Sequence, residues 1–132
     1  MLNAKIAALA GALLFAQSSF AGPLACPDVD LIKSEGVKAV GALKHFVGFQ
    51  SHKYDTDNWW SFAVGPVYSE TEEDAQTALE ELLTNLVGTP NPMQSDIGSW
   101  VCHYETNMPK TYAIAIWNPM GQDEAIRFIP AA

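Results

Sequence analysis

Residues 69–88 read SETEEDAQTALEELLTNLVG and form the clearest helical pattern in the chain. Ser69 and Glu72 fit a capping box, with Thr71 as an alternative N-cap. Acidic residues crowd the first turn, where the helix dipole favours negative charge. Gly88 and the prolines that follow predict the end of the helix. Apolar residues recur at helical spacing and predict one buried stripe: Ala75, Leu79, Leu82, Leu83 and Leu86.

Two pairs of predicted strands flank this helix. A polar turn at residues 55–58 joins the first pair, and Asn107-Met108-Pro109 joins the second pair as a hairpin. A further short edge strand is expected at residues 125–129. The four main segments show apolar alternation or β-rich composition: residues 42–52, 59–67, 99–106 and 110–118.

A shorter helix is expected near the start of the mature chain. Asp28 is a suitable N-cap, and Gly36 is a suitable stop. The helix could instead continue to Leu43, because Val37, Val40 and Leu43 keep helical spacing. Gly36 and Gly41 count against this longer helix, since glycine is unfavourable inside helices.

The order of elements is therefore α-β-β-α-β-β. It predicts an α+β fold in which one long amphipathic helix packs on one face of an antiparallel sheet of about four strands. One helix covers only one face, so the second face needs a separate account. There we expect an aromatic-lined groove, with small residues between two large ones: Ala63, Gly65, Ala113 and Ala115 between Trp59 and Trp117.

Residues 1–21 predict a cleaved export signal, and residues 22–132 a single domain. Lys5 precedes a short apolar run at residues 6–16, and small residues lead to a cleavage position after Ala21. The stretch ending at Cys26 also resembles a lipoprotein signal, but the prolines around it are atypical. We expect a periplasmic or secreted protein without lipid on Cys26.

The composition excludes several classes of protein. The chain has 132 residues, of which 48% are hydrophobic and 17% charged, as in a globular domain. Seven scattered basic residues cannot neutralise a run of phosphates, so nucleic acid is not an expected partner. No apolar run is long enough for an ordinary transmembrane helix. Loss of Lys5 with the signal would change the net charge from −8 to −9, which favours solubility.

The two cysteines, Cys26 and Cys102, predict one disulfide in an oxidising compartment. It would tie the N-terminal segment to a late strand. The alternative is a catalytic thiol at Cys102 beside His103. Neighbours on a strand point to opposite faces, however, so this histidine is poorly placed to deprotonate the thiol.

The sequence carries no recognisable catalytic motif, and we lean against an enzyme. A nucleophile elbow, a P-loop, a dinucleotide-binding fingerprint and a zincin motif are all missing from the chain. His52 with Asp55 and Asp57 could hold an ion weakly, but a polar turn beside a surface histidine is the simpler interpretation. We therefore predict no metal site and no required cofactor.

Aromatic residues and histidines are the best candidates for ligand binding. Trp59 and Trp60 are adjacent on a predicted strand, so at most one enters the core easily. The alternative is that the N-terminal segment, held by the disulfide, folds over these aromatics. The candidate ligand-binding residues are Trp59, Trp117, His103, His52 and Tyr54.

A flat porphyrin is one ligand that such a groove could take. Residues of the types that bind haem iron are His45, His52, Tyr54, His103 and Met108. No C-x-x-C-H motif is present, so covalent haem attachment is not expected.

Ala25-Cys26-Pro27-Asp28 and the later Trp100-Val101-Cys102-His103-Tyr104 resemble motifs of a group of small exported bacterial proteins of unknown function. Some members of that group are labelled haemin-binding proteins. The resemblance spans most of the mature chain. It implies that haemin is a candidate ligand, but it does not say which residues of this chain would bind haemin.

Three functions follow as hypotheses. The first is an exported, non-enzymatic protein that binds a small apolar or planar ligand such as haemin. The second is a protein–protein interaction module, either a homodimer or an inhibitor of a secreted enzyme. The third, and the weakest, is a small hydrolase that uses carboxylates or His103.

Overall fold

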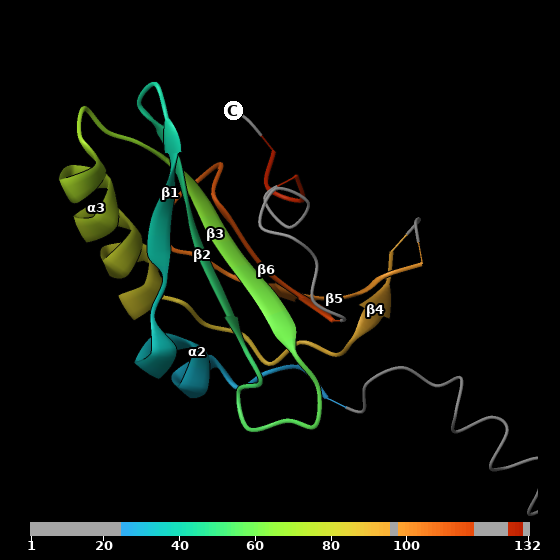
Figure 1. Ribbon diagram of the computed structural model, residues 1–132. Coiled ribbons are helices and arrows are strands. Elements are labelled where there is room, and N and C mark those ends of the chain that lie inside the picture. Colours follow the sequence, from blue (N-terminus) through green and yellow to red (C-terminus); the bar gives the residue numbers. More distant parts are fainter. Residues whose placement is uncertain (1–24, 96–97, 118–126, 131–132) are drawn as a thin grey trace, which may run out of the picture.

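The structure is a computed structural model, and it describes residues 25–95, 98–117 and 127–130. The expected export signal at residues 1–21 lies outside this part of the chain. The elements, labelled in Figure 1, follow in the order α2 (Val29–Glu35), β1 (Lys38–Ala42), β2 (His45–His52), β3 (Trp60–Tyr68), α3 (Glu72–Thr84), β4 (Met93–Gln94), β5 (Trp100–Tyr104) and β6 (Tyr112–Trp117).

The fold is mostly β, which corrects the expected four-stranded sheet with one long helix. The strands form a six-stranded antiparallel sheet in the order β1-β2-β3-β6-β5-β4. The described helices are both short, with seven residues in α2 and 13 in α3. Two strands, β1 and β4, were not expected from the sequence. Residues 125–129 were expected to form an edge strand, but 127–129 form a turn and a bend, and 125–126 lie outside the described residues.

Strand β1 was missed because its residues keep helical spacing and its turn lacks the usual turn residues. The turn to β2 consists of Leu43 and Lys44, which have φ values of 55° and 70°. A two-residue hairpin turn with both φ values positive normally contains Asn, Asp or Gly. Gly41, just before this turn, has a φ of 153° and no room for a side chain, because a Cβ there would lie 2.1 Å from the carbonyl oxygen of His45.

Local capping explains where the helices begin and end. Asp28 caps α2 by accepting a hydrogen bond from the N–H of Asp30, and Gly36 ends the helix, as predicted. Helix α3 begins after Thr71, the alternative cap, which accepts from the N–H of Asp74. The helix ends before Val87 because the backbone of that residue forms a β-bridge with Glu105.

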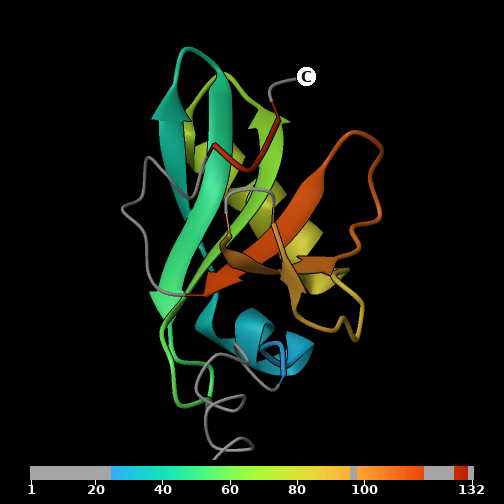
Figure 2. The same cartoon turned by 90° about the vertical axis from the view of Figure 1, so that its right-hand side faces the viewer.

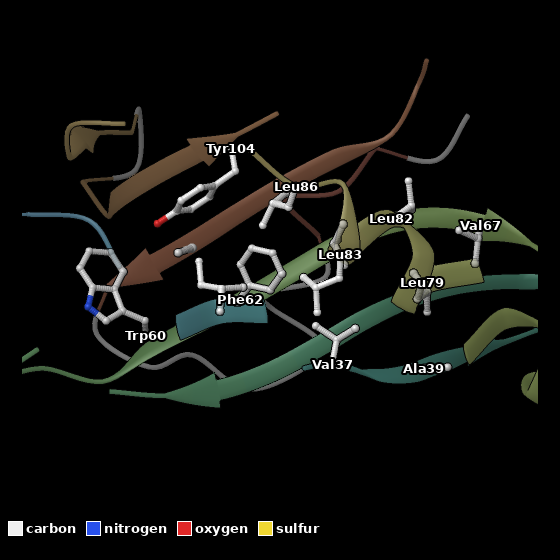
Figure 3. Packing of buried hydrophobic residues seen from close by; sticks show 14 of the residues in the cluster. Val37, Ala39, Trp60, Phe62, Val67, Leu79, Leu82, Leu83, Leu86 and Tyr104 are labelled. Atoms are coloured by element: carbon white, nitrogen blue, oxygen red, sulfur yellow. The ribbon is translucent and has the colours of Figure 1, made fainter. Parts of the chain in front are cut away.

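Helix α3 covers one face of the sheet (Figure 1), which we call the helix face. Its leucine stripe packs on side chains of the central strands. In Figure 3, Leu79, Leu82 and Leu83 lie over Phe62 and Val67 of β3. The stripe predicted from the sequence is thus buried as expected, since all five of its members are 0–4% exposed.

The second face has its own small core, which corrects the expected groove. Val47, Val101, Ile114 and Ile116 are buried there with Ala63, and Phe128 and Ile129 of the C-terminal segment pack on them. Figure 1 shows this segment on the opposite side of the sheet from α3.

Ala113 and Ala115 lie on the helix face, where they were not expected. The register explains the difference, because β6 places small residues beside large ones of β3. Phe62 pairs with Ala115, and Ala63 pairs with Ile114. On the helix face large side chains of β3 thus lie beside small ones of β6, and on the second face Ser61 and Ala63 of β3 lie beside Ile116 and Ile114 of β6.

The predicted disulfide joins Cys26 to Cys102 of β5 and holds the N-terminal segment against the helix face. Nearby, the hydroxyl of Tyr104 donates a hydrogen bond to the carbonyl oxygen of Pro27. Because the sulfur of Cys26 is bonded to Cys102, it has no thiol for a lipid. Neither helix in the described part of the chain is long and apolar enough to cross a bilayer.

Candidate functional site

Four of the five predicted binding residues lie at one end of the sheet, beside α2. The strand register aligns His52 with Trp60 and Trp60 with Trp117. Tyr54 follows β2, and Trp59 precedes β3. Figure 2 shows the connection between these two strands next to α2, at the end of the sheet away from the β1–β2 turn.

His52 is fully engaged within the protein. Its Nδ1 accepts a hydrogen bond from the N–H of Tyr54 at 2.9 Å, and its Nε2 lies 2.8 Å from a carboxylate oxygen of Glu35 on α2. The acceptor role of Nδ1 assigns the ring proton of the neutral form to Nε2. Since both nitrogens are occupied, His52 holds the loop after β2 against α2 and offers no free ligand atom.

Tyr54 is a core residue, with 1% of its surface exposed and a φ of 49°. Its hydroxyl is buried and has no hydrogen-bond partner among the described residues. Burial, together with the negative charge of Glu35, raises the pKa of the Tyr54 hydroxyl far above its usual value. This tyrosine is therefore neutral under ordinary conditions and is closed to a ligand from solvent.

The Trp59-Trp60 pair splits between solvent and core, as the strand geometry predicted. Trp60 is fully buried, and its Nε1 donates to the Oγ1 of Thr56 at 3.1 Å. Trp59 is 47% exposed, and the ammonium of Lys53 lies 5.9 Å from the centroid of its ring. Trp59 thus packs against a neighbouring lysine at the surface.

Trp117 is half-buried and packs against the helix-face core. Its Nε1 is buried and lacks a partner within the described residues. Tyr54 and Trp117 therefore face the interior, whereas Trp59 faces solvent. The structure brings these residues to one end of the sheet but does not place them around one open surface.

His103 lies at a different place, on β5, and its side chain is exposed. It lines a surface hollow of about 400 Å³ beside the β5–β6 hairpin, which we call the hairpin hollow. This hollow also contains Met108, a residue that the sequence offered only as an iron-ligand type. The larger side chains that line it include Val87, His103, Tyr104, Met108 and Tyr112.

Hydrogen bonds within the hairpin hold Met108 in place. The backbone carbonyl oxygen of Met108 accepts from the Oγ1 of Thr111 at 2.7 Å and from the Oγ1 of Thr106 at 3.1 Å. Glu105 is anchored to Val87 by two backbone hydrogen bonds, of 2.8 and 3.1 Å. These bonds tie two residues that line the hollow, Met108 and Val87, to the hairpin and to the end of β5.

Val87 and Tyr112 were not singled out from the sequence. Val87 was assigned to the end of the helix, and Tyr112 to an apolar strand face together with Ile114 and Ile116. Both are exposed, at 53% and 44% of their surface. Neither exposure follows from the local pattern of the sequence around the residue.

The described residues contain no group of three or more His, Cys, Asp or Glu side chains that could hold a metal ion. The residues that line the hairpin hollow include an imidazole (His103), a thioether (Met108), a carboxylate (Glu105) and an exposed phenol (Tyr112).

A family model described as a domain of unknown function, DUF4949, matches residues 25–124. The chain belongs to this family. No curated protein and no solved structure matches the chain. The DUF4949 match includes both disulfide cysteines and the hairpin hollow, and it ends before Phe128 and Ile129. Its description does not mention haemin, so the family membership assigns no ligand.

Proposed function

We propose that this protein is an exported, non-enzymatic binding protein that holds a flat apolar ligand in the hairpin hollow, and that haemin is such a ligand. The observation that carries the proposal is that His103 and Met108 line the same hollow. An imidazole and a thioether are both ligand types that haem iron accepts.

The other donors of suitable type are less accessible. Both nitrogens of His52 are engaged, and the Tyr54 hydroxyl is buried. His45 is half-buried, and its ring lies edge-on to that of Tyr68, with the ring centroids 5.4 Å apart. His103 is the exposed histidine among these candidates, which favours the hairpin hollow over the α2 end of the sheet.

The apolar side chains around His103 suit a flat ligand. Met108, Val87 and Tyr112 are each about half exposed, at 52%, 53% and 44%. Methionine and tyrosine present polarisable or aromatic surfaces that pack on planar rings. A ligand seated there would remove this exposed apolar surface from water, which favours binding.

Export agrees with the disulfide, because such bonds persist in oxidising compartments. The acidic net charge, −8 for the whole chain and −9 once Lys5 is lost with the signal, favours solubility but also weakens the attraction of an anionic ligand at long range. Binding must therefore depend on short-range contacts with iron and with the apolar walls.

Titration of the purified protein with haemin, followed at the Soret band, tests the proposal. We expect saturable binding with a shifted Soret band, and at least roughly tenfold weaker binding for His103→Ala. Met108→Leu preserves the packing but removes the thioether, so it should alter the spectrum more than the affinity. His45→Ala serves as the matched histidine control and should bind like the wild type.

Equal haemin binding by an unrelated acidic protein would show that the interaction is non-specific and contradict the proposal. The same conclusion would follow if His103→Ala and His45→Ala bound haemin equally well.

A further inference from the structure

Exposed apolar side chains gather at the end of the sheet away from α2, which we call the apolar end. Leu43, Tyr68 and Met108 are 97%, 57% and 52% exposed. In Figure 2, the β1–β2 turn, the end of β3 and the β5–β6 hairpin all lie toward this end. Large apolar patches on a small protein are frequently sites of interaction with a partner.

Leu43 is the most exposed of these residues and also adopts an unfavourable backbone conformation. Its φ of 55° is disfavoured for a leucine, and its side chain buries almost nothing. Neither property stabilises the folded chain, and strained residues of this kind are concentrated at functional sites. Lys44 fixes the turn, since its carbonyl oxygen accepts from the N–H of Ser69 at 3.0 Å and its ammonium lies 3.2 Å from Glu70.

A surface groove of about 370 Å³ lies at this end between α3 and the β5–β6 hairpin, and we call it the helix–hairpin groove. Its wall is mainly apolar: Pro66, Tyr68, Ala78, Met108 and Pro109. Lys110 is the cation among the residues that line it. Tyr68 is the last residue of β3 and pairs with His45, the first residue of β2, so the groove is close to the β1–β2 turn.

The helix side of the groove is strongly acidic. Helix α3 has five carboxylates and no basic residue. Asp74 and Glu81 lie four residues before and three after Ala78, so they share its side of the helix. In the described part of the chain the ion pairs are Lys44–Glu70 and His52–Glu35, and therefore no ion pair neutralises α3.

We propose that the apolar end docks a basic polypeptide segment of a partner protein that carries an apolar side chain. The apolar side chain would occupy the helix–hairpin groove beside Tyr68 and Ala78, and the basic residues would face Asp74 and Glu81. The carboxylates favour a cationic polypeptide and oppose an anionic lipid surface. This surface shares Met108 with the hairpin hollow, but it is lined by Ala78 of α3 and not by His103.

A labelled, lysine-rich peptide with a central phenylalanine is the probe, and its binding to the full-length exported protein is measured by fluorescence anisotropy. We expect it to bind roughly tenfold more tightly than the same peptide with serine in place of phenylalanine. The double variant Leu43→Asn/Tyr68→Ser should lose roughly this tenfold advantage, whereas Trp59→Ser, at the other end of the sheet, should retain it.

The contribution of charge is tested with two variants that have equal net charge. Asp74→Asn/Glu81→Gln should weaken binding several-fold, and Asp55→Asn/Asp57→Asn, in the loop beside α2, should not. Circular dichroism confirms that each variant is folded.

Equal losses from the two charge variants would reveal general electrostatic attraction and overturn the proposal. So would equal affinity for the phenylalanine and serine peptides, or an unchanged affinity in Leu43→Asn/Tyr68→Ser. Sedimentation of the protein with anionic vesicles, without binding of the peptide, would assign the apolar end to a lipid surface instead.

Discussion

The side-chain amide of Gln76 on α3 pairs with the backbone of Ala39 on the edge strand β1. Its Oε1 accepts from the N–H of Ala39 at 2.7 Å, and its Nε2 donates to the carbonyl oxygen of Val37 at 2.8 Å. The amide thus takes the place of a neighbouring strand at this position. An open edge strand is a template for pairing with another chain, and the contact closes part of that edge.

Gln76→Ala should therefore lower stability and promote association. Losing two hydrogen bonds to a partly buried backbone should reduce the free energy of unfolding by about 1–3 kcal/mol. Urea unfolding measures this loss, and light scattering over a concentration series detects association through the edge. Thr77→Ala, on the exposed side of the same helix, is the control. Equal stability of the two variants would show that the amide contributes nothing.

Leu43→Asn should stabilise the protein, because asparagine tolerates positive φ better than leucine. We expect a gain of about 0.5–1 kcal/mol in the free energy of unfolding. Leu43→Ala removes the same exposed side chain but remains unfavourable at positive φ, so it should give no such gain. A similar gain from both variants would attribute the effect to exposure rather than to backbone conformation.

The buried tyrosines should make the protein sensitive to alkali. Burial raises the pKa values of Tyr54 and Tyr104 far above normal, and the charges of Glu35 and Asp28 add to this effect. Above about pH 10 the unfolded chain releases these phenolic protons while the native protein retains them. Stability should therefore be unaffected by these groups below that pH and fall as the pH rises above it.

Tyr54→Phe removes one of the two buried phenols, so its stability should fall less steeply above pH 10 than that of the wild type. Tyr112→Phe, at an exposed tyrosine, should follow the wild-type profile. Urea unfolding across the alkaline range measures both. Identical profiles for Tyr54→Phe and the wild type would contradict the burial of this hydroxyl.

Ile129→Asp should destabilise the native state and expose the second face of the sheet. Ile129 is 5% exposed and packs with Ile114 and Ile116. Placing a carboxylate there should reduce the free energy of unfolding by at least about 2 kcal/mol. Binding of a hydrophobic dye should rise under native conditions. Arg127→Asp, an exposed substitution in the same segment, should have little effect, and equal dye binding by both variants would refute the covering role of Ile129.

Loss of the disulfide should also reduce stability. The bridge closes a loop with a sequence separation of 76, and the chain-entropy model gives a contribution of about 4 kcal/mol for a loop of this size. Urea unfolding with and without a reductant measures it. The Cys26→Ser/Cys102→Ser variant should match the reduced protein and should not respond to the reductant. If the reductant did not change the urea midpoint of the wild-type protein, the disulfide would have no stabilising role.

Local sequence patterns predicted the features that depend on near neighbours. The leucine stripe of α3, the cap at Asp28 and the split between Trp59 and Trp60 all follow from helix or strand geometry over a few residues. The cap of α3 is Thr71, which the sequence offered only as the alternative to Ser69. The disulfide followed from the cysteine count and the expected compartment. Of the proposed site, His103 was chosen from the sequence, and Met108 was recognised by type alone.

Long-range features could not be predicted in this way. The helical spacing of Val37 and Val40 was misleading, because pairing with β2 overrides local propensity. Ala113 and Ala115 were assigned to the wrong face of the sheet because strand alternation separates two sets of residues but does not say which set faces the helix.

The sequence by itself determined the acidic globular composition, the amphipathic helix and the pair of cysteines, since each depends on residue identity or short spacing. Only the tertiary structure decided which sheet face the C-terminal segment covers, which histidine stays exposed and which apolar side chains remain in solvent. Those outcomes depend on contacts between segments far apart in the chain, where the packing of large against small side chains selects one register.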